Sequence, residues 1–246
     1  MQPPVAILTC NFTPPVGDKP ALFTHDEVLT LLHEFGHGLH HLLCNVDYPA
    51  ASSMQAVPWD VIELPSQFME NWGWEKQGMD LLSGHYETGQ SLDDTLFNKM
   101  RAAKNFQSAM YIMRQLEFAL FDFKLHVEYD PTVHDQIQQI LNKVRQAVAV
   151  TPIVPYNRFQ HSFTHIFSGG YAAGYYSYLW ADVLSADAFS RFKEEGIFNR
   201  DTGRSFLQNI LEPGGTEEPL ELFKRFRGRA PNIKALLEQN GIKNNL

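Results

Sequence analysis

His33-Glu34-Phe35-Gly36-His37 is the stretch that decides how this chain folds and which chemistry it can carry. It has the pattern H-E-x-x-H, and a helix would place the two histidines one turn apart on the same face. That spacing lets both imidazoles bind one zinc ion while the carboxylate of Glu34 stands beside a metal-bound water. The pattern is short and also occurs by chance on ordinary helices, so its surroundings must be weighed with it.

The flanking residues predict a helix over about residues 24–44. Thr24 and Glu27 match a capping box, in which each side chain accepts a hydrogen bond from the other residue's backbone N–H. Apolar residues then recur at helical spacing, at Val28, Leu31, Leu32, Phe35, Leu39 and Leu42. Gly36 and Gly38 lie inside this helix, where each costs about 1 kcal/mol relative to alanine. We therefore expect another backbone segment to approach the helix closely there.

A catalytic zinc ion usually has three protein ligands and one open position, so a third ligand is needed. His40 and His41 are nearest in sequence, but histidines in a row along one helix cannot converge on one tetrahedral ion. His41 lies about 12 Å along the helix axis from His33. The longer pattern H-E-x-x-H-x-x-G-x-x-H also fails, because the chain has His40 and Leu43 where it needs glycine and histidine. The third ligand should come from a later segment.

A second amphipathic helix is predicted over about residues 60–76. Glu63 would lie in its first turn, and Glu70 seven residues later on the same face. The residues alone leave the role of Glu63 open, because it also fits an ordinary capping-box partner of Asp60.

Together, HEFGHGLHHLL (residues 33–43) and VIELPSQFMENW (residues 61–72) resemble the M3 family of zinc oligopeptidases, the thimet oligopeptidase and neurolysin family, and in particular its bacterial members. The resemblance runs from about Pro4 to near the C-terminus. It implies a mainly α, zincin-like metallopeptidase catalytic domain that binds one Zn²⁺ per chain. It also implies that Glu63 is the third zinc ligand beside His33 and His37, and that Glu34 is the general base.

Residues that would orient these ligands are less well defined. In thermolysin-like enzymes an aspartate four residues after the ligand glutamate often orients a histidine, but this chain has Gln67 there, as the M3 pattern does. Glu70 and Asp26, each seven residues from a ligand on its own helix, are the alternatives.

The segment HSFTHIFSGGYAAGYYSYLW (residues 161–180) predicts a glycine-rich loop followed by an aromatic helix from about residue 172. Tyr171, Tyr175 and Tyr178 recur at the helical spacing i, i+4, i+7, so their hydroxyls can reach one face together. Tyrosines at such spacing are more often core residues with a hydrogen-bonded hydroxyl than functional groups. The M3 resemblance implies that Tyr175 and Tyr178 donate hydrogen bonds to the oxyanion that develops during peptide hydrolysis, and that the loop contacts substrate. His165 is a further candidate donor, and a surface histidine is the simpler alternative.

Composition limits the remaining possibilities. The chain has 246 residues, of which 44% are hydrophobic, which is enough for a real core. Its net charge of −8 argues against a nucleic-acid partner or an anionic membrane surface. Cys10 and Cys44 match no disulfide or metal spacing and are expected to be buried thiols. Without a signal-peptide pattern or a transmembrane run, we expect a cytoplasmic protein.

Along the rest of the chain the patterns indicate a mainly α fold with one minor strand at Val5–Phe12, followed by a turn at Pro14–Asp18. Residues 44–58 should be a loop, and Thr151–Pro155 should break a helix. Further helices are expected at about residues 94–126, 132–148, 172–195, 205–211, 216–227 and 231–239.

Members of the M3 family are much longer, with an N-terminal region that forms one wall of a substrate channel. The resemblance therefore implies that residues 1–246 are a C-terminal catalytic domain, which hydrolyses short peptides weakly in the absence of that region and exposes apolar surface where it would pack. Two alternatives remain. In the first, the domain binds zinc or a partner without turnover, and the intact Glu34 argues against this. In the second, the chain is a helical scaffold without metal, which requires the ligand set to be a coincidence.

Overall fold

Helix α1 (His25–Leu43) carries the H-E-x-x-H stretch, and its first turn is held by the predicted capping box. The backbone N–H of Thr24 donates to Glu27 Oε2 at 2.7 Å, and the backbone N–H of Glu27 donates to Thr24 Oγ1 at 3.2 Å. The predicted start of this helix is therefore confirmed at the level of individual hydrogen bonds. The structure is a computed structural model that describes residues 3–52 and 54–242.

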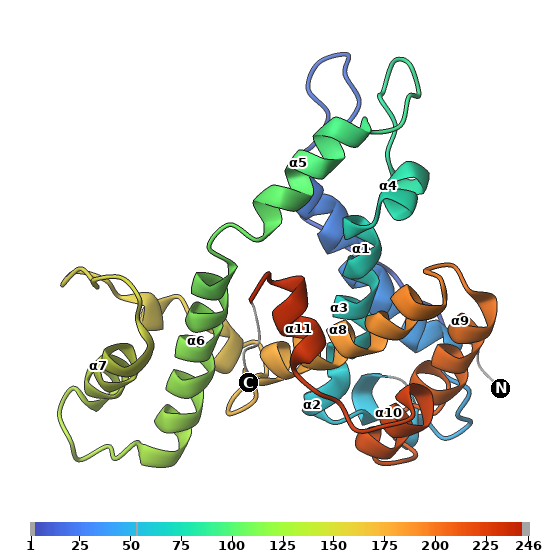
Figure 1. Ribbon diagram of the computed structural model, residues 1–246. Helices are drawn as coiled ribbons and strands as arrows, with labels where there is room; N and C mark the ends of the chain where they lie inside the picture. Colours follow the sequence, from blue (N-terminus) through green and yellow to red (C-terminus); the bar gives the residue numbers. More distant parts are fainter. Residues whose placement is uncertain (1–2, 53, 243–246) are drawn as a thin grey trace. The chain divides into compact units, whose positions relative to one another are not determined.

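The chain forms two compact units, each with its own core (Figure 1). Unit 1 comprises Met1–Phe106 and Ala181–Leu246, and unit 2 comprises Gln107–Trp180. The helical elements of unit 1 are α1, η1 (Pro49–Ala51), η2 (Met54–Ala56), α2 (Trp59–Ile62), α3 (Leu64–Glu70), η3 (Asn71–Trp74), α4 (Lys76–Leu82), α5 (Asp94–Lys104), most of α8 (Ser177–Glu195), α9 (Arg200–Phe206), the π-helical turn η6 (Leu207–Leu211), α10 (Pro219–Arg227) and α11 (Lys234–Gln239).

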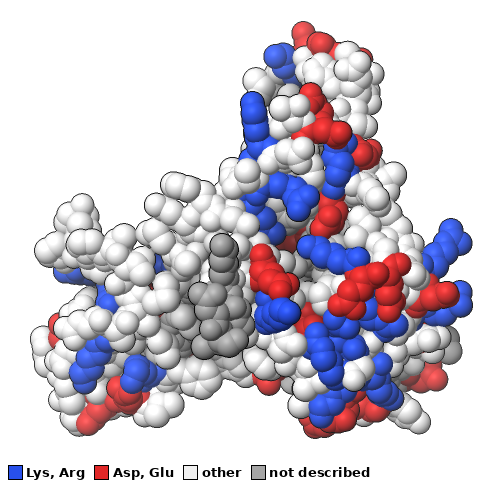
Figure 2. Space-filling model, in the orientation of Figure 1, with Lys and Arg blue, Asp and Glu red and all other residues white. Residues whose placement is uncertain are grey.

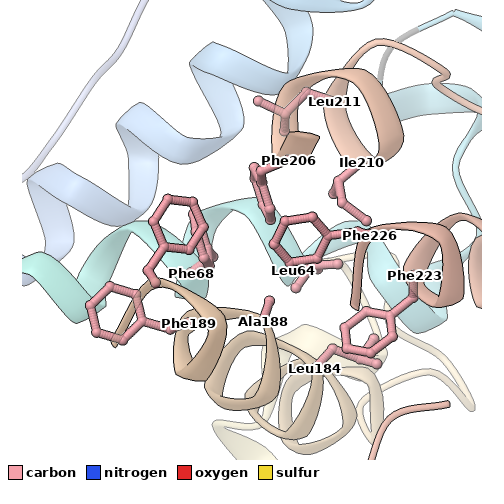
Figure 3. Close-up of a cluster of buried hydrophobic side chains, with 11 residues drawn as sticks. Leu64, Phe68, Leu184, Ala188, Phe189, Phe206, Ile210, Leu211, Phe223 and Phe226 are labelled. Atoms are coloured by element: carbon pink, nitrogen blue, oxygen red, sulfur yellow. The ribbon is translucent and has the colours of Figure 1, made fainter. Parts of the chain in front are cut away.

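The core of unit 1 fixes helix α3, which follows the proposed ligand Glu63 directly. Phe68 of α3 stacks on Phe206 of α9 with ring centroids 4.0 Å apart, and side chains of α8 and α10 close around them (Figure 3). Each fully buried side chain of this size stabilises the fold by about 1.5–3 kcal/mol. Because Leu64 is also buried in this cluster, the backbone position of Glu63 is set by core packing.

Unit 2 is built on the helices α6 (Ser108–Glu128) and α7 (Gln136–Val148), which pack against each other. Two 3₁₀ turns follow, η4 (Phe159–His161) and η5 (Thr164–Ile166). The unit's apolar core contains Phe121, Leu141 and Phe163, and one end of it receives the ring of Tyr175. The core of unit 2 therefore holds one of the tyrosines that the sequence singled out.

The predicted strand at Val5–Phe12 is wrong, although the mainly α fold is confirmed. These residues have no regular structure, and the side chain of Ile7 is 88% exposed. Within the described residues, β pairing is limited to an isolated bridge between Val16 and Lys19, at the predicted turn. A strand needs a neighbour for its backbone N–H and C=O groups, and β-forming composition alone does not supply one.

Several predicted helices are interrupted. The helix expected over residues 60–76 breaks at Glu63, where α2 ends and α3 begins. Pro65 explains the break, because it has no N–H to donate and restricts the residue before it. The helix expected over residues 94–126 breaks before α6, where Gln107 has a φ of +55°. Helix α8 begins at Ser177, later than residue 172, and the loop at residues 44–58 contains two 3₁₀ turns.

Charged side chains of both signs interleave over the face of unit 1 that carries α9 and α10 (Figure 2). Typical pairs there are Arg227 with Glu194 and Lys224 with Glu221, each at 2.7 Å. The net negative charge is therefore not concentrated on that face. Among the described residues, no helix has the length and apolar character that crossing a membrane requires.

Candidate metal centre

Helices α1 and α3 lie side by side (Figure 1). Gly36 of α1 lies against the backbone of α3. A Cβ atom at this position would lie 2.4 Å from the carbonyl oxygen of Pro65 and 2.6 Å from Cα of Ser66. Both of these are backbone atoms, so no side chain can be accommodated. At Gly38 an added Cβ would lie 3.3 Å from Cδ2 of Leu8. This is a side-chain atom, so a side chain at Gly38 is less strongly restricted. The expected close backbone approach is thus present at Gly36, directly beside the ligand candidates.

Three side chains converge where these helices meet. Glu63 Oε2 lies 3.3 Å from His33 Nε2 and 3.1 Å from His37 Nε2, and one ligand atom from each of the three residues lies within 4.8 Å of the others. Zinc bonds of about 2.0–2.2 Å in a tetrahedron place neighbouring ligand atoms about 3.3 Å apart. Two imidazole nitrogens and one carboxylate oxygen are also the donor types of a catalytic zinc site. The residues therefore fit a zinc ion in both chemistry and spacing.

Glu63 is buried at the break between α2 and α3, and Ser66 holds its carboxylate. The hydroxyl oxygen of Ser66 lies 2.9 Å from Glu63 Oε2 and 2.9 Å from the carbonyl oxygen of Glu63. Helix α2 begins after Pro58, so Asp60 is not the N-cap residue that a capping box with Glu63 requires. Sequence reasoning gave Ser66 no role, although a hydroxyl three residues after a glutamate at a helix start is a recognisable signal.

His33 is held from its other side by Glu70 of α3. Glu70 Oε1 lies 2.7 Å from Nδ1 of His33, so an Nδ1–H would donate to the carboxylate and leave Nε2 facing Glu63. Burial, the largest single effect, lowers the pKa of His33, but hydrogen bonds with Glu63 and Glu70 and their charges together raise it to about 10. Of the two alternatives from the sequence, the structure favours Glu70, because Asp26 is exposed on α1.

Asp182 on α8 belongs to the same charged environment and was not found from the sequence. Burial, and then the negative charge of Glu70, raise the pKa of its carboxyl group to about 7. His37 differs from His33, because its Nδ1 is buried and has no hydrogen-bond partner among the described residues. Glu34, the residue after His33 on α1, is half-buried, and its role as general base stays a prediction.

Within unit 2 the candidate donors gather in one aromatic cluster. The ring centroid of Tyr178 lies 5.0 Å from that of Tyr171, 5.1 Å from that of Tyr175 and 6.2 Å from that of His165. Tyr171 has no regular structure and Tyr175 lies in a turn, and both precede α8. The sequence thus identified residues that do lie together, but for a reason other than helical periodicity.

Tyr175 also has the features of a core tyrosine. Its side chain is buried, and its hydroxyl donates to Gln115 Oε1 at 3.1 Å. Burial raises the pKa of this hydroxyl to about 12, so it stays protonated and able to donate at neutral pH. His165 is exposed, as the simpler alternative expected. The functional roles of these residues stay predictions.

The comparison with known protein families gives a match over almost the whole chain. Residues 1–242 match the model of peptidase family M3. The chain belongs to this family. Two proteins named oligopeptidase A, from Salmonella typhimurium and Escherichia coli, are each 63% identical to it over 243 residues. Saccharolysin from Saccharomyces cerevisiae is 36% identical over 242 residues.

These M3 relatives are much longer than the chain. The alignments cover 99% of this chain but 36% of each oligopeptidase A, and 98% of this chain but 34% of saccharolysin. The chain therefore spans about a third of the length of the curated relatives it matches. That third contains the complete candidate ligand set, His33, His37 and Glu63.

Proposed function

We propose that this chain supplies the zinc-binding and catalytic residues of a metallopeptidase that hydrolyses short peptides. The observation that carries the proposal is the convergence of His33, His37 and Glu63 on one point, with the spacing of a tetrahedral zinc site. Membership of peptidase family M3 supports the reaction class, and the names of the relatives support oligopeptides as substrates.

The metal would be held by Nε2 of both histidines and by the carboxylate of Glu63. When bound, zinc supplies a Lewis acid and lowers the pKa of a coordinated water toward about 7. When His33 gives up one proton to bind the metal, Glu70 keeps the remaining proton on Nδ1, which leaves Nε2 as the ligand atom. Ser66 restrains the carboxylate of Glu63. These two contacts orient the ligand atoms before any metal arrives.

Glu34 is the proposed general base. Its carboxylate accepts a proton as water attacks the scissile carbonyl carbon, and then passes that proton to the leaving amine. Tyr175 or Tyr178 is the proposed donor to the oxyanion, with His165 as a further candidate. These roles come from the M3 resemblance, and one of them requires a hydroxyl that stays protonated, as that of Tyr175 does.

We further propose that efficient turnover requires polypeptide beyond this third of the M3 length. The coverage of the relatives supports this, because the chain matches 36% of oligopeptidase A and 34% of saccharolysin. A site that excludes little water and holds the peptide from one side should hydrolyse peptides slowly. Cytoplasmic location and the absence of nucleic-acid and membrane partners stay predictions from composition.

Metal analysis after reconstitution with zinc tests the proposal most directly. We expect about one zinc per chain, a large loss in His33→Ala, His37→Ala and Glu63→Ala, and no loss in the control His134→Ala, which changes an exposed histidine of unit 2. Unchanged stoichiometry in Glu63→Ala would refute the third ligand. Hydrolysis of a quenched short peptide, by this chain and by a full-length form, then separates a peptidase from a domain that only binds zinc.

A further inference from the structure

Asp122 on α6 is completely buried, and the proposed reaction does not use it. Its carboxylate accepts two backbone hydrogen bonds from residues 171–178, which we call the tyrosine segment. Oδ1 accepts from the N–H of Ala173 and Oδ2 from the N–H of Tyr175, both at 2.9 Å. His126, one turn further along α6, places Nδ1 2.9 Å from the same Oδ1. The buried carboxylate thus accepts from two backbone N–H groups and has an imidazole nitrogen within hydrogen-bond distance.

The backbone at Ala173 explains why two N–H groups point at one carboxylate. Its φ of +54° lies in the left-handed region, which an alanine rarely adopts. Alternation of left- and right-handed residues turns neighbouring N–H groups toward one point and forms a concave anion site. A buried carboxylate without such donors is strongly unfavourable. Asp122 and the strained turn therefore stabilise each other.

Helix α6 also holds the other end of the same tyrosine. The hydroxyl of Tyr175 donates to Gln115, which lies seven residues before Asp122 and therefore on the same face of α6. Between these two contacts the Tyr175 ring packs against Phe118 and Phe163, with centroids 5.6 Å and 5.0 Å away. One helix face thus fixes the backbone, the ring and the hydroxyl of Tyr175.

We propose that Asp122 and Gln115 are positioning residues for Tyr175. Asp122 fixes the backbone of the tyrosine segment, and Gln115 holds the Tyr175 hydroxyl oxygen in place until its single proton turns from Gln115 Oε1 to the oxyanion. This inference rests on the proposed function of Tyr175. An oxyanion donor works because it is oriented before the reaction, so its supports should affect the transition state more than substrate binding.

Hydrogen exchange followed by NMR tests the physical contact without any turnover. In Asp122→Asn the amide presents an N–H group to the turn, so one of the two backbone donors loses its acceptor. We expect the amides of Ala173 and Tyr175 to exchange at least about tenfold faster, while the amide of Leu141 in the core of unit 2 is unchanged. The matched control is Glu128→Gln, which removes a carboxylate from the exposed end of the same helix.

Kinetics of the peptide-hydrolysing form test the role through a double-mutant cycle. We expect Asp122→Asn to lower kcat about tenfold or more with little change in KM, and Glu128→Gln to leave both unchanged. If Asp122 acts through Tyr175, adding Asp122→Asn to Tyr175→Phe should cause no further loss. If Asp122→Asn does not fold, Gln115→Leu gives a second cycle. The contact between Gln115 and the Tyr175 hydroxyl is already absent in Tyr175→Phe, so adding Gln115→Leu to that variant should change kcat no further.

The outcomes separate this inference from the proposed function. Unchanged exchange at Ala173 and Tyr175 in Asp122→Asn overturns the positioning role, and so do independent, multiplicative losses in the double mutants. A zinc-loaded wild-type enzyme that is active but insensitive to Tyr175→Phe overturns the role of Tyr175 and leaves the peptidase assignment intact. A zinc-loaded full-length form without any peptide hydrolysis overturns the proposed function itself.

Discussion

Glu70 Oε1 lies 2.7 Å from Nδ1 of His33, while Nε2 of the same imidazole faces Glu63. The ring is thus fixed between a carboxylate that orients it and the point where the ligand atoms converge. Such supporting contacts commonly change metal affinity by about 10–100-fold when they are removed. Glu70 therefore belongs to the candidate metal centre, although it is not one of the three candidate ligands.

Glu70→Ala should weaken zinc binding by about 10–100-fold without abolishing it, because all three ligands remain and only the orientation of His33 is lost. Competition with a chromophoric chelator measures the dissociation constant. Glu87→Ala, at an exposed position of unit 1, is the control and should bind like the wild type. Equal affinity in both variants would show that Glu70 does not orient His33.

Zinc binding at pH 8 should release about one proton per ion from His33, in addition to the proton that a zinc-bound water with a pKa near 7 gives up. An ordinary histidine is almost entirely neutral at that pH, but the pKa of His33 in the metal-free protein is raised to about 10. The ion must displace this proton. Calorimetric titrations in buffers of different ionisation enthalpy count the protons released, and Glu70→Gln should release fewer. A wild-type value no larger than that of Glu70→Gln would contradict the raised pKa.

Glu34→Gln should retain zinc and lose turnover in the active form of the enzyme. The amide has the same shape but cannot accept the proton from the attacking water. Loss of a general base commonly costs about 10²–10⁴-fold in rate. Metal analysis and a quenched-peptide assay on the same preparation separate the two effects. Retention of more than about a tenth of the rate would require another base.

Gly36→Ala should destabilise unit 1 and disturb the metal centre. The added Cβ would lie 2.4 Å from a backbone oxygen, so α1 and α3 must move apart, at a cost of about 1–3 kcal/mol or more. Gly203→Ala in α9 is the matched control, because nothing lies within 4 Å of its added Cβ. It should be neutral or stabilise by up to about 1 kcal/mol. Denaturant unfolding of both variants measures the difference, and equal stabilities would show that the approach of the helices is adjustable.

The local parts of this site could be predicted from the sequence, and the long-range parts could not. The capping box at Thr24 and the spacing of His33 and His37 depend on neighbours within one or two turns, and both were predicted correctly. The cost of Gly36 in a helix also indicated a close approach, but the pattern does not say which segment approaches. Only the folded chain shows that it is the backbone at Pro65.

The wrong predictions have two origins, a local signal that was overlooked and contacts that the local sequence does not reveal. Periodicity predicted one helix through Glu63, although Pro65 was a visible reason for a break. The strand at Val5–Phe12 was inferred from composition, but a strand depends on a partner that composition does not reveal. Asp182 lies far along the chain on α8, and nothing in its local pattern relates it to Glu70. Its environment arises only when α8 packs in the core of unit 1.

Asp182 should make the stability of the metal-free protein depend on pH. Burial and the charge of Glu70 raise the pKa of its carboxyl group from 3.8 to about 7 in the folded state. As pH rises from about 4 to 7, the carboxyl group loses its proton in the unfolded chain before it does so in the folded protein. The free energy of unfolding therefore falls over that pH window and is not changed further by Asp182 above it.

Asp182→Asn removes this pH dependence. The variant should therefore gain stability relative to the wild type between pH 4 and pH 8, by at most about 4 kcal/mol for three pKa units. Denaturant unfolding at both pH values measures this, with Asp201→Asn, a 94% exposed aspartate, as the control. A difference between Asp182→Asn and the wild type that does not vary with pH would mean that Asp182 ionises normally in the folded protein.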